Sequence, residues 1–280
     1  RGGALTENRI EYAPPLLERY AMYFNAVRGP GDHPNPYFPF FHLAGSLRGG
    51  GASFWHLQPR PGRESVFESM STARTARQMT ENIDHARLDT ELFELLQDER
   101  AVDALSAVLA ETWFDRGLRD LDAVVGRTRQ INHYERVLRS SNSPALIAAE
   151  AAPSYVRDPA FRRVVTENYD FRCAATGLRL VLPDGAAMVE AAHIHPFSEA
   201  ADDDPRNGLA LTPDMHWALD RHLITPDTDF RWRVSSSLDR RIPDYRVLTE
   251  LEGKPLFLPR EARMYPKQAA IEWRMAMLLR

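Results

Sequence analysis

A short unit in the second half of the chain limits the possible folds more than any other segment. Residues 178–182 and 188–194 are rich in apolar residues and predict two strands, joined by a Pro-Asp-Gly turn at 183–185. An acidic loop at 199–204 then leads to a helix that starts near Pro213. The sequence therefore predicts a helix packed on a strand hairpin.

This unit carries four side chains that can perform chemistry. His193 lies at the end of the second strand, Asn207 lies in the following loop, and His216 and Asp220 lie on the helix. Because residues four apart share one face of a helix, His216 and Asp220 can bind a single divalent cation. His193 is then free to act as a general base. A base facing a metal-bound phosphate is what phosphodiester hydrolysis needs.

Three blocks of the unit, in this order, resemble the His-Asn-His (HNH) endonuclease family. The resemblance covers about residues 160–225 and implies a ββα-metal nuclease core. It also implies that His193 is the general base, that Asn207 holds the loop, and that His216 and Asp220 bind Mg²⁺, with Mn²⁺ as an alternative. The blocks are Glu-Ala-Ala-His-Ile-His-Pro-Phe-Ser at 190–198, Asn-Gly-Leu-Ala-Leu at 207–211 and His-Trp-Ala-Leu-Asp-Arg at 216–221.

Two positions depart from the pattern of this family. Many relatives have a metal ligand immediately before the base, where this chain has Ala192. Water or phosphate oxygens would therefore have to complete the coordination. Many relatives also have a four-cysteine zinc site, but Cys173 is the single cysteine here, so neither a structural zinc nor an internal disulfide is expected.

Two nearby residues offer alternatives. His195 is a second candidate for the base, because it lies two residues further along the strand and on the same side. The spacing to Asn207 favours His193, since it matches the family. Glu190 is a candidate for an additional carboxylate at the metal site.

The first 140 residues predict a mixed α/β domain. Its aromatic segment at 37–43 is expected to be a strand or extended turn that forms a hairpin with a strand at 53–57, across a glycine-rich turn at 45–51. Helices are expected on both sides of this hairpin. Their ranges are about 11–28, 71–97, 99–114 and 124–138.

The aromatic segment is similar to a pattern in the sulfur-binding domains of McrA-like type IV restriction enzymes. That resemblance implies recognition of phosphorothioate DNA, in which sulfur replaces one non-bridging phosphate oxygen. Sulfur is softer and less well hydrated than oxygen, so a shallow apolar cup would favour it. The same aromatic residues are also expected to supply part of the domain core. The candidate DNA or sulfur contacts are Phe38, Pro39, Phe40 and His42, with Arg28, His33 and Arg48 on the flanking loops.

Polar turn-forming residues at 140–144 predict a domain boundary. We therefore expect an α+β protein with a DNA-recognition domain at 1–140, a linker at 141–157 and an HNH nuclease domain at 158–280. The formal net charge is −4 and there is no basic tail, so bulk charge does not point to nucleic acid. No apolar run is long enough to span a bilayer, and the single cysteine makes a cytoplasmic location the default.

The sequence as a whole predicts a modification-dependent DNA endonuclease acting on double-stranded DNA. One HNH site cuts one strand, so a double-strand break requires two sites and a homodimer is expected. Two alternatives remain open. One is an HNH nuclease that cuts methylated or unmodified DNA. The other is a DNA-binding sensor whose nuclease is degenerate because Ala192 supplies no ligand.

Overall fold

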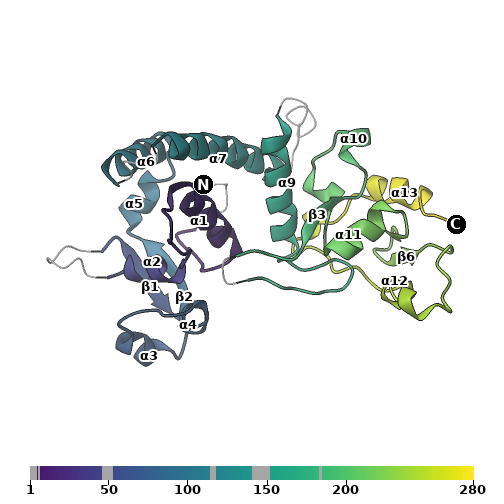
Figure 1. The fold of residues 1–280 in the computed structure, drawn as a ribbon, viewed down its shortest axis with the longest axis horizontal. Helices are drawn as coiled ribbons and strands as arrows, with labels where there is room; N and C mark the ends of the chain where they lie inside the picture. Colours follow the sequence, from purple (N-terminus) through teal and green to yellow (C-terminus); the bar gives the residue numbers. More distant parts are fainter. Residues whose placement is uncertain (1–4, 6, 46–52, 114–117, 141–151, 183–184) are drawn as a thin grey trace. The chain divides into compact units, whose positions relative to one another are not determined.

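A computed structural model describes residues 5, 7–45, 53–113, 118–140, 152–182 and 185–280. They form two compact units, one comprising residues 3–129 and 182–186 and the other comprising residues 130–181 and 187–280. Both units combine helices with short antiparallel strands, which confirms the α+β class (Figure 1). No helix within the described ranges is both long and apolar enough to cross a membrane.

The first unit contains one strand pair and several helices. Its core joins aromatic side chains of α2 and β1 to Met79, Ile83 and Ala86. The expected helices at 11–28, 99–114 and 124–138 are confirmed by α1, α6 and α7. The elements are α1 Pro14–Val27, α2 Tyr37–His42, β1 Trp55–Pro59, α3 Glu64–Ser69, α4 Ala76–Asn82, β2 Ile83–Leu88, α5 Thr90–Leu95, α6 Glu99–Trp113 and α7 Leu118–Arg139.

The aromatic segment at 37–43 is a helix, so its prediction as a strand or extended turn was wrong. The helical turn buries Phe40 and Phe41 together while Phe38 and His42, four residues apart, share the exposed face. A proline is tolerated in the first turn of a helix. Burial of the adjacent aromatic rings in the core therefore overrides the strand preference of aromatic residues.

The hairpin predicted from 37–43 and 53–57 was also wrong in its pairing. β1 does form, but it pairs antiparallel with β2, with Trp55 opposite Leu88 and Leu57 opposite Ala86. β2 interrupts the stretch 71–97, which was expected to be helical throughout. Because Ile83 and Ala86 are buried in the core against β1, pairing with a distant segment outweighs the local helical pattern.

The second unit begins within α7, whose Ile131, Tyr134 and Leu138 belong to its core. α9 begins at Ser154 and ends at Asn168. The elements that follow α7 are α9 Ser154–Asn168, β3 Glu190–His193, α10 Phe197–Ala200, η1 Pro205–Asn207, β4 Gly208–Leu211, α11 Pro213–Asp220, β5 Ile224–Pro226, β6 Trp232–Val234, η2 Pro243–Tyr245, α12 Arg246–Thr249, η3 Ala262–Met264 and α13 Gln268–Ala276.

The described part of the second unit contains the strand pairs β3–β4 and β5–β6. The first of them forms across the acidic loop, which corrects the expected strand order. β3 pairs antiparallel with β4, from Glu190 opposite Leu211 to His193 opposite Gly208. The expected strand at 178–182 is absent there, and only an isolated bridge joins Val181 to Ala187. The alternating leucines of 178–182 are exposed, so their two-residue repeat has no core to face.

Two helices contact this strand pair. α9 and α11 both pack against β3 and β4. Gly208 faces α9, since a Cβ atom there would lie close to Val165 and Phe161, and its cross-strand partner His193 faces the same side. Glu190 is three residues from His193 and contacts His216 of α11. The two ends of β3 therefore point their side chains to opposite faces.

The close approach of α9 to β4 predicts the effect of a single methyl group. A Cβ atom at Gly208 would lie 2.5 Å from Val165 Cγ2 and 2.9 Å from Phe161 Cζ, so we expect Gly208→Ala to destabilise the fold by about 1–3 kcal/mol. Gly126 in α7 has no such neighbour within 4 Å, and Gly126→Ala should stabilise the chain by about 0.5–1 kcal/mol. Urea denaturation measures both changes. Equal midpoints for Gly208→Ala and wild type would contradict the packing described.

Candidate active site

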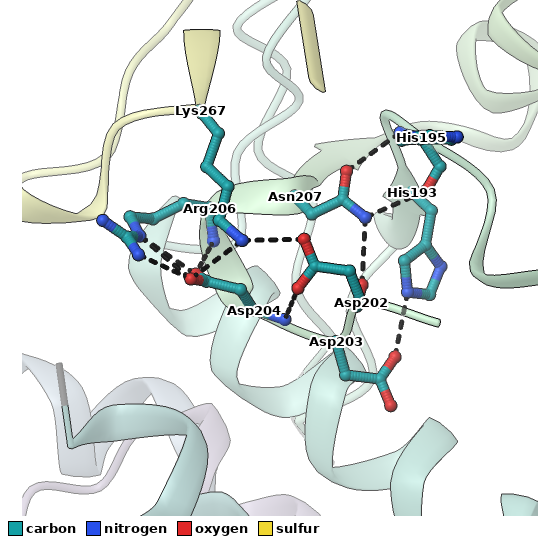
Figure 2. Close-up of polar contacts among 8 residues, drawn as sticks. All are labelled: His193, His195, Asp202, Asp203, Asp204, Arg206, Asn207 and Lys267. Atoms are coloured by element: carbon teal, nitrogen blue, oxygen red, sulfur yellow. Dashed lines mark hydrogen bonds and ion pairs between the residues drawn. The ribbon is translucent and has the colours of Figure 1, made fainter. Parts of the chain in front are cut away.

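His193 is held at the end of β3 by its contacts with Phe161 and Asp203. Its ring stacks on Phe161 of α9, with ring centroids 4.0 Å apart and an interplanar angle of 1°. Its Nε2 atom lies 3.0 Å from Oδ1 of Asp203 (Figure 2). The side chain remains 24% exposed, and within the described part of the chain Nδ1 forms no hydrogen bond. Nδ1 is therefore the nitrogen available to a substrate.

Asp203 lies in the acidic loop, and its side chain is only 3% exposed. Its second oxygen, Oδ2, accepts hydrogen bonds from the Tyr134 hydroxyl and from Nη1 of Arg157, each at 3.1 Å. Burial raises the pKa of Tyr134, and the neighbouring Asp203 charge adds to the rise. The phenol therefore stays protonated and remains a donor.

Asn207 closes the loop between β3 and β4. Its side chain is fully buried. Its Oδ1 accepts a hydrogen bond from the backbone N–H of His195, and its Nδ2 donates to the carbonyl oxygens of His195 and Asp202, all at 2.9 Å (Figure 2). The amide thus ties the start of the loop to its end and acts through the backbone.

The other two carboxylates of the acidic loop are neutralised by basic side chains. Lys267 Nζ lies 2.7 Å from Asp202 and 3.1 Å from Asp204, and the Arg206 guanidinium also binds Asp204 (Figure 2). Burial acts to raise the pKa of Asp204, but the hydrogen bonds from Arg206 and Lys267 outweigh it and hold that pKa below its ordinary value. Asp202 and Asp204 therefore stabilise the conformation of the acidic loop through these ion pairs.

A second group of polar side chains gathers on the α11 side of the strand pair. His216 Nδ1 lies 3.0 Å from Glu190 Oε2, and His216 Nε2 lies 3.5 Å from Asp220 Oδ2. Glu190 and Asp220 are both more than half exposed. The structure therefore brings the predicted metal ligands His216 and Asp220 together and places Glu190 on the other ring nitrogen of His216.

The donor atoms of His216 and Asp220 fit a divalent cation. Two ligands at about 2.0–2.2 Å from one ion lie roughly 3–3.5 Å from each other, and the observed separation is 3.5 Å. Glu190 on Nδ1 leaves the lone pair of Nε2 for such an ion, as is usual for a carboxylate that orients a ligating histidine. Among the residues that the structure describes, no group of three His, Cys, Asp or Glu side chains is placed to hold a metal. Ala192 is fully buried and contributes no donor.

Arg274 of α13 connects the two groups. Its guanidinium donates from Nε to the Ile194 carbonyl at 2.6 Å, from Nη2 to the His193 carbonyl at 3.0 Å and from Nη1 to the Leu219 carbonyl at 3.2 Å. The residue is 1% exposed. Burial lowers the pKa of Arg274, but a guanidinium titrates so high that it stays charged. One side chain thus joins the strand end that carries the base to the helix end that carries Asp220.

His195 occupies a different environment from His193. Its ring stacks on Trp273, with centroids 4.1 Å apart and an interplanar angle of 15°. Its Nε2 lies 3.8 Å from Glu199, and its backbone is held by Asn207. Only His193 is bonded to a buried carboxylate, which favours His193 as the base.

In the first unit, Phe38 and His42 form an exposed aromatic pair on α2. Phe38 is 52% exposed, and the two ring centroids lie 4.2 Å apart. His42 is further held by Thr72, at 2.9 Å from Nε2 to Oγ1, while Pro39 is half-buried. This pair presents apolar surface to solvent.

The other residues predicted to contact DNA are placed differently. Phe40 is buried, and its ring meets Trp55 edge to face at 5.2 Å while its carbonyl accepts a hydrogen bond from the Trp55 indole. It belongs to the core, as expected for part of this segment. Arg28 and His33 are exposed. Arg48, with most of the glycine-rich turn, lies outside the described residues, as does most of the expected boundary at 140–144.

Three residues around the site were not identified from the sequence. Asp203 is one of several consecutive acidic residues, and the sequence alone does not distinguish it from its neighbours. Phe161 lies on α9 ahead of the strand pair, and Arg274 lies near the end of the chain. Spacing within a motif carries no signal for such contacts, which the tertiary fold alone creates.

Comparison with known proteins finds a family match within the second unit. Residues 173–225 match the HNH endonuclease family model, whereas no curated protein matches the chain. One similar solved structure is titled "Modification dependent TagI restriction endonuclease"; it is 18% identical, with a TM-score of 0.33, and the match covers 44% of this chain and 39% of that chain. The family match includes Asn207, His193 and His216. The second unit of this chain therefore contains an HNH endonuclease domain.

Proposed function

We propose that this chain is a metal-dependent DNA endonuclease whose first unit selects phosphorothioate DNA. The observation that carries the nuclease assignment is the placement of His193 within the matched HNH domain. Its Nε2 is bonded to a buried carboxylate, and its Nδ1 is left for a water molecule. That is the arrangement of a general base.

In the proposed reaction, His193 Nδ1 removes a proton from water as the water oxygen bonds to the phosphorus. The bond from phosphorus to the leaving oxygen breaks, and that oxygen takes a proton from solvent. Asn207 keeps the loop backbone in place during this step. A divalent cation bound by His216 and Asp220 would neutralise charge on the phosphoryl and leaving oxygens. We propose Mg²⁺ as this ion, with Mn²⁺ as a substitute, because the carboxylate oxygen of Asp220 and completing water or phosphate oxygens suit both ions.

The exposed pair of Phe38 and His42 supports the proposal for sulfur recognition. An aromatic surface open to solvent costs little to desolvate, and it favours a soft, weakly hydrated sulfur over a strongly hydrated oxygen. Arg28 and His33 are exposed and can contact flanking phosphates. Phe38, Pro39 and His42 would contact the sulfur atom, whereas Phe40 belongs to the core.

Cleavage of matched duplexes tests both parts of the proposed function. We expect Mg²⁺ or Mn²⁺ to support cutting of a duplex with one phosphorothioate, EDTA to stop it, and an unmodified duplex to be cut poorly. Phe38→Ala should lower the preference for phosphorothioate DNA about tenfold, which corresponds to about 1.4 kcal/mol of lost contact. Val66→Ala is the control, because Val66 is an exposed apolar residue of the same unit.

The possible outcomes separate the alternatives. Equal cutting of both duplexes would refute the proposed selectivity and leave the nuclease assignment intact. A preference for a methylated duplex would replace sulfur by a methyl group as the recognised mark. Tight binding without cutting in either metal would indicate a degenerate sensor, for which the buried Ala192 next to the base is the structural argument.

We also propose that two copies act together on double-stranded DNA. One HNH site cuts one strand, so a double-strand break requires a second site on the opposite strand. Sedimentation of the protein with a cleavable duplex, followed by native gels of the products, measures the stoichiometry and the number of cut strands. A monomer that makes both cuts would overturn this part.

A further inference from the structure

We propose that Asp203 is a positioning residue that fixes the tautomer of His193. This inference rests on the proposed function of the HNH domain and assigns a task to one carboxylate of the acidic loop. Asp203 holds the proton of the imidazole on Nε2, so that Nδ1 keeps its lone pair for the water molecule.

An ionised carboxylate can only accept hydrogen bonds. Asp203 Oδ1 lies 3.0 Å from His193 Nε2 (Figure 2), so Nε2 must carry the hydrogen of that bond. A neutral imidazole has one N–H and one lone pair. The lone pair therefore resides on Nδ1, the atom that forms no other hydrogen bond among the described residues.

The carboxylate itself is held from two helices. Tyr134 of α7 and Arg157 of α9 both donate to Oδ2, each at 3.1 Å. The Arg157 guanidinium is in turn held 3.7 Å from the centroid of the Phe197 ring. Arg157 compensates the buried charge and Tyr134 adds a second donor, so the Asp203 carboxylate is held in one orientation.

The stacking of His193 completes the constraint. Phe161 lies parallel to the imidazole and stops the ring from tilting, while the bond to Asp203 lies at the ring edge and stops it from rotating. Gly208 lies opposite His193 in the strand pair and leaves room for this stack. Nδ1 therefore has a fixed direction.

The same carboxylate stabilises the protonated state of the base. When Nδ1 takes a proton from water, the imidazole becomes a cation 3.0 Å from a buried negative charge. Arg157 on α9 and Tyr134 on α7 face the carboxylate of this dyad. The guanidinium of Arg274 on α13 donates to the backbone carbonyl of His193.

The neighbouring aspartates cannot take over this task. Asp202 and Asp204 are bound by Lys267 and Arg206, and Asp203 alone contacts His193 among the described side chains of the loop. Asp203→Asn is therefore a sharp test. Tyr134 and Arg157 both donate, so they will hold the amide oxygen and turn the amide NH₂ group toward Nε2. Nε2 then has to accept, and the imidazole hydrogen moves to Nδ1.

We expect Asp203→Asn to lower kcat about 10- to 100-fold with little change in KM. The same substitution in a His193→Ala background should cause no further loss, since the residue it positions is absent. Asp244→Asn, an exposed carboxylate of the same unit, is the control and should cut at the wild-type rate. Equal losses in both backgrounds would show a merely structural role.

A second measurement does not depend on cleavage. ¹⁵N chemical shifts of His193 at alkaline pH should show the hydrogen on Nε2 in the wild type and on Nδ1 in Asp203→Asn. An unchanged tautomer in a folded Asp203→Asn protein would overturn the inference even if the enzyme is active. If the wild type cuts no duplex but the tautomer switches, the proposed function fails and the positioning role of Asp203 stands.

Discussion

Replacing His193 by alanine is expected to lower the rate of DNA cleavage about 10²- to 10⁴-fold, the usual contribution of a general base. The variant keeps the backbone contacts of the strand end, since Arg274 and Asn207 bind main-chain atoms there. Binding of DNA should therefore change little. The free energy of unfolding should fall, because Oδ1 of the buried Asp203 loses its partner and Phe161 loses its stacked ring. The loss should appear in single-turnover cleavage at saturating protein.

Two matched histidine variants make this result decisive. His133 on α7 is exposed, and His133→Ala should cut like the wild type. His195 stacks on Trp273 without a bond to a buried carboxylate, and His195→Ala should retain most of the activity. If His195→Ala is inactive while His193→Ala still cuts, the base is His195 and the proposed mechanism is wrong.

The second large effect is expected from Arg274→Ala. The substitution removes a charged, buried donor from the carbonyl oxygens of His193, Ile194 and Leu219. It also removes the contact of this guanidinium with Nδ1 of His222. We expect a loss of about 3–5 kcal/mol in the free energy of unfolding. Cleavage should fall as well, because the strand end with the base and the helix end before Asp220 lose their common support.

Chemical denaturation and cleavage assays measure the two consequences of Arg274→Ala separately. Arg246→Ala is the matched control, since Arg246 is exposed, and it should change stability by less than about 0.5 kcal/mol. Arg274→Lys keeps the charge but not the planar arrangement of donors, so it should recover only part of the stability. A change below about 1 kcal/mol for Arg274→Ala would show that the three carbonyls find other partners.

The local signals of the sequence predicted part of this structure correctly. Long helices such as α6 and α7 follow from their own apolar repeats, and the family spacing of His193, Asn207 and His216 identified the nuclease unit. These features depend on residues close together in the chain. Local periodicity and motif spacing are enough to define them.

Pairing between distant segments was not predictable in the same way. β4 was taken for part of a loop because its four residues are all buried and show no alternation, and β2 was hidden within a helical pattern. The contacts that support His193 come from α7, α9 and the acidic loop, and Arg274 reaches it from α13. The motif therefore identifies the reacting residues, but the residues that position them are known only from the tertiary structure.

The strand β3 is supported by residues outside the matched segment, and this limits how the nuclease domain can be fused to another protein. The segment that matches the HNH family, residues 173–225, contains the reacting side chains but excludes Tyr134, Arg157, Phe161 and Arg274. If that segment alone were grafted, His193 would lack the Phe161 ring on which it stacks. The end of β3 would also lack the Arg274 guanidinium that binds its carbonyl groups. A transferable nuclease domain must therefore extend from the second half of α7 to α13. A domain cut to the motif would contain the reacting residues without the residues that position them.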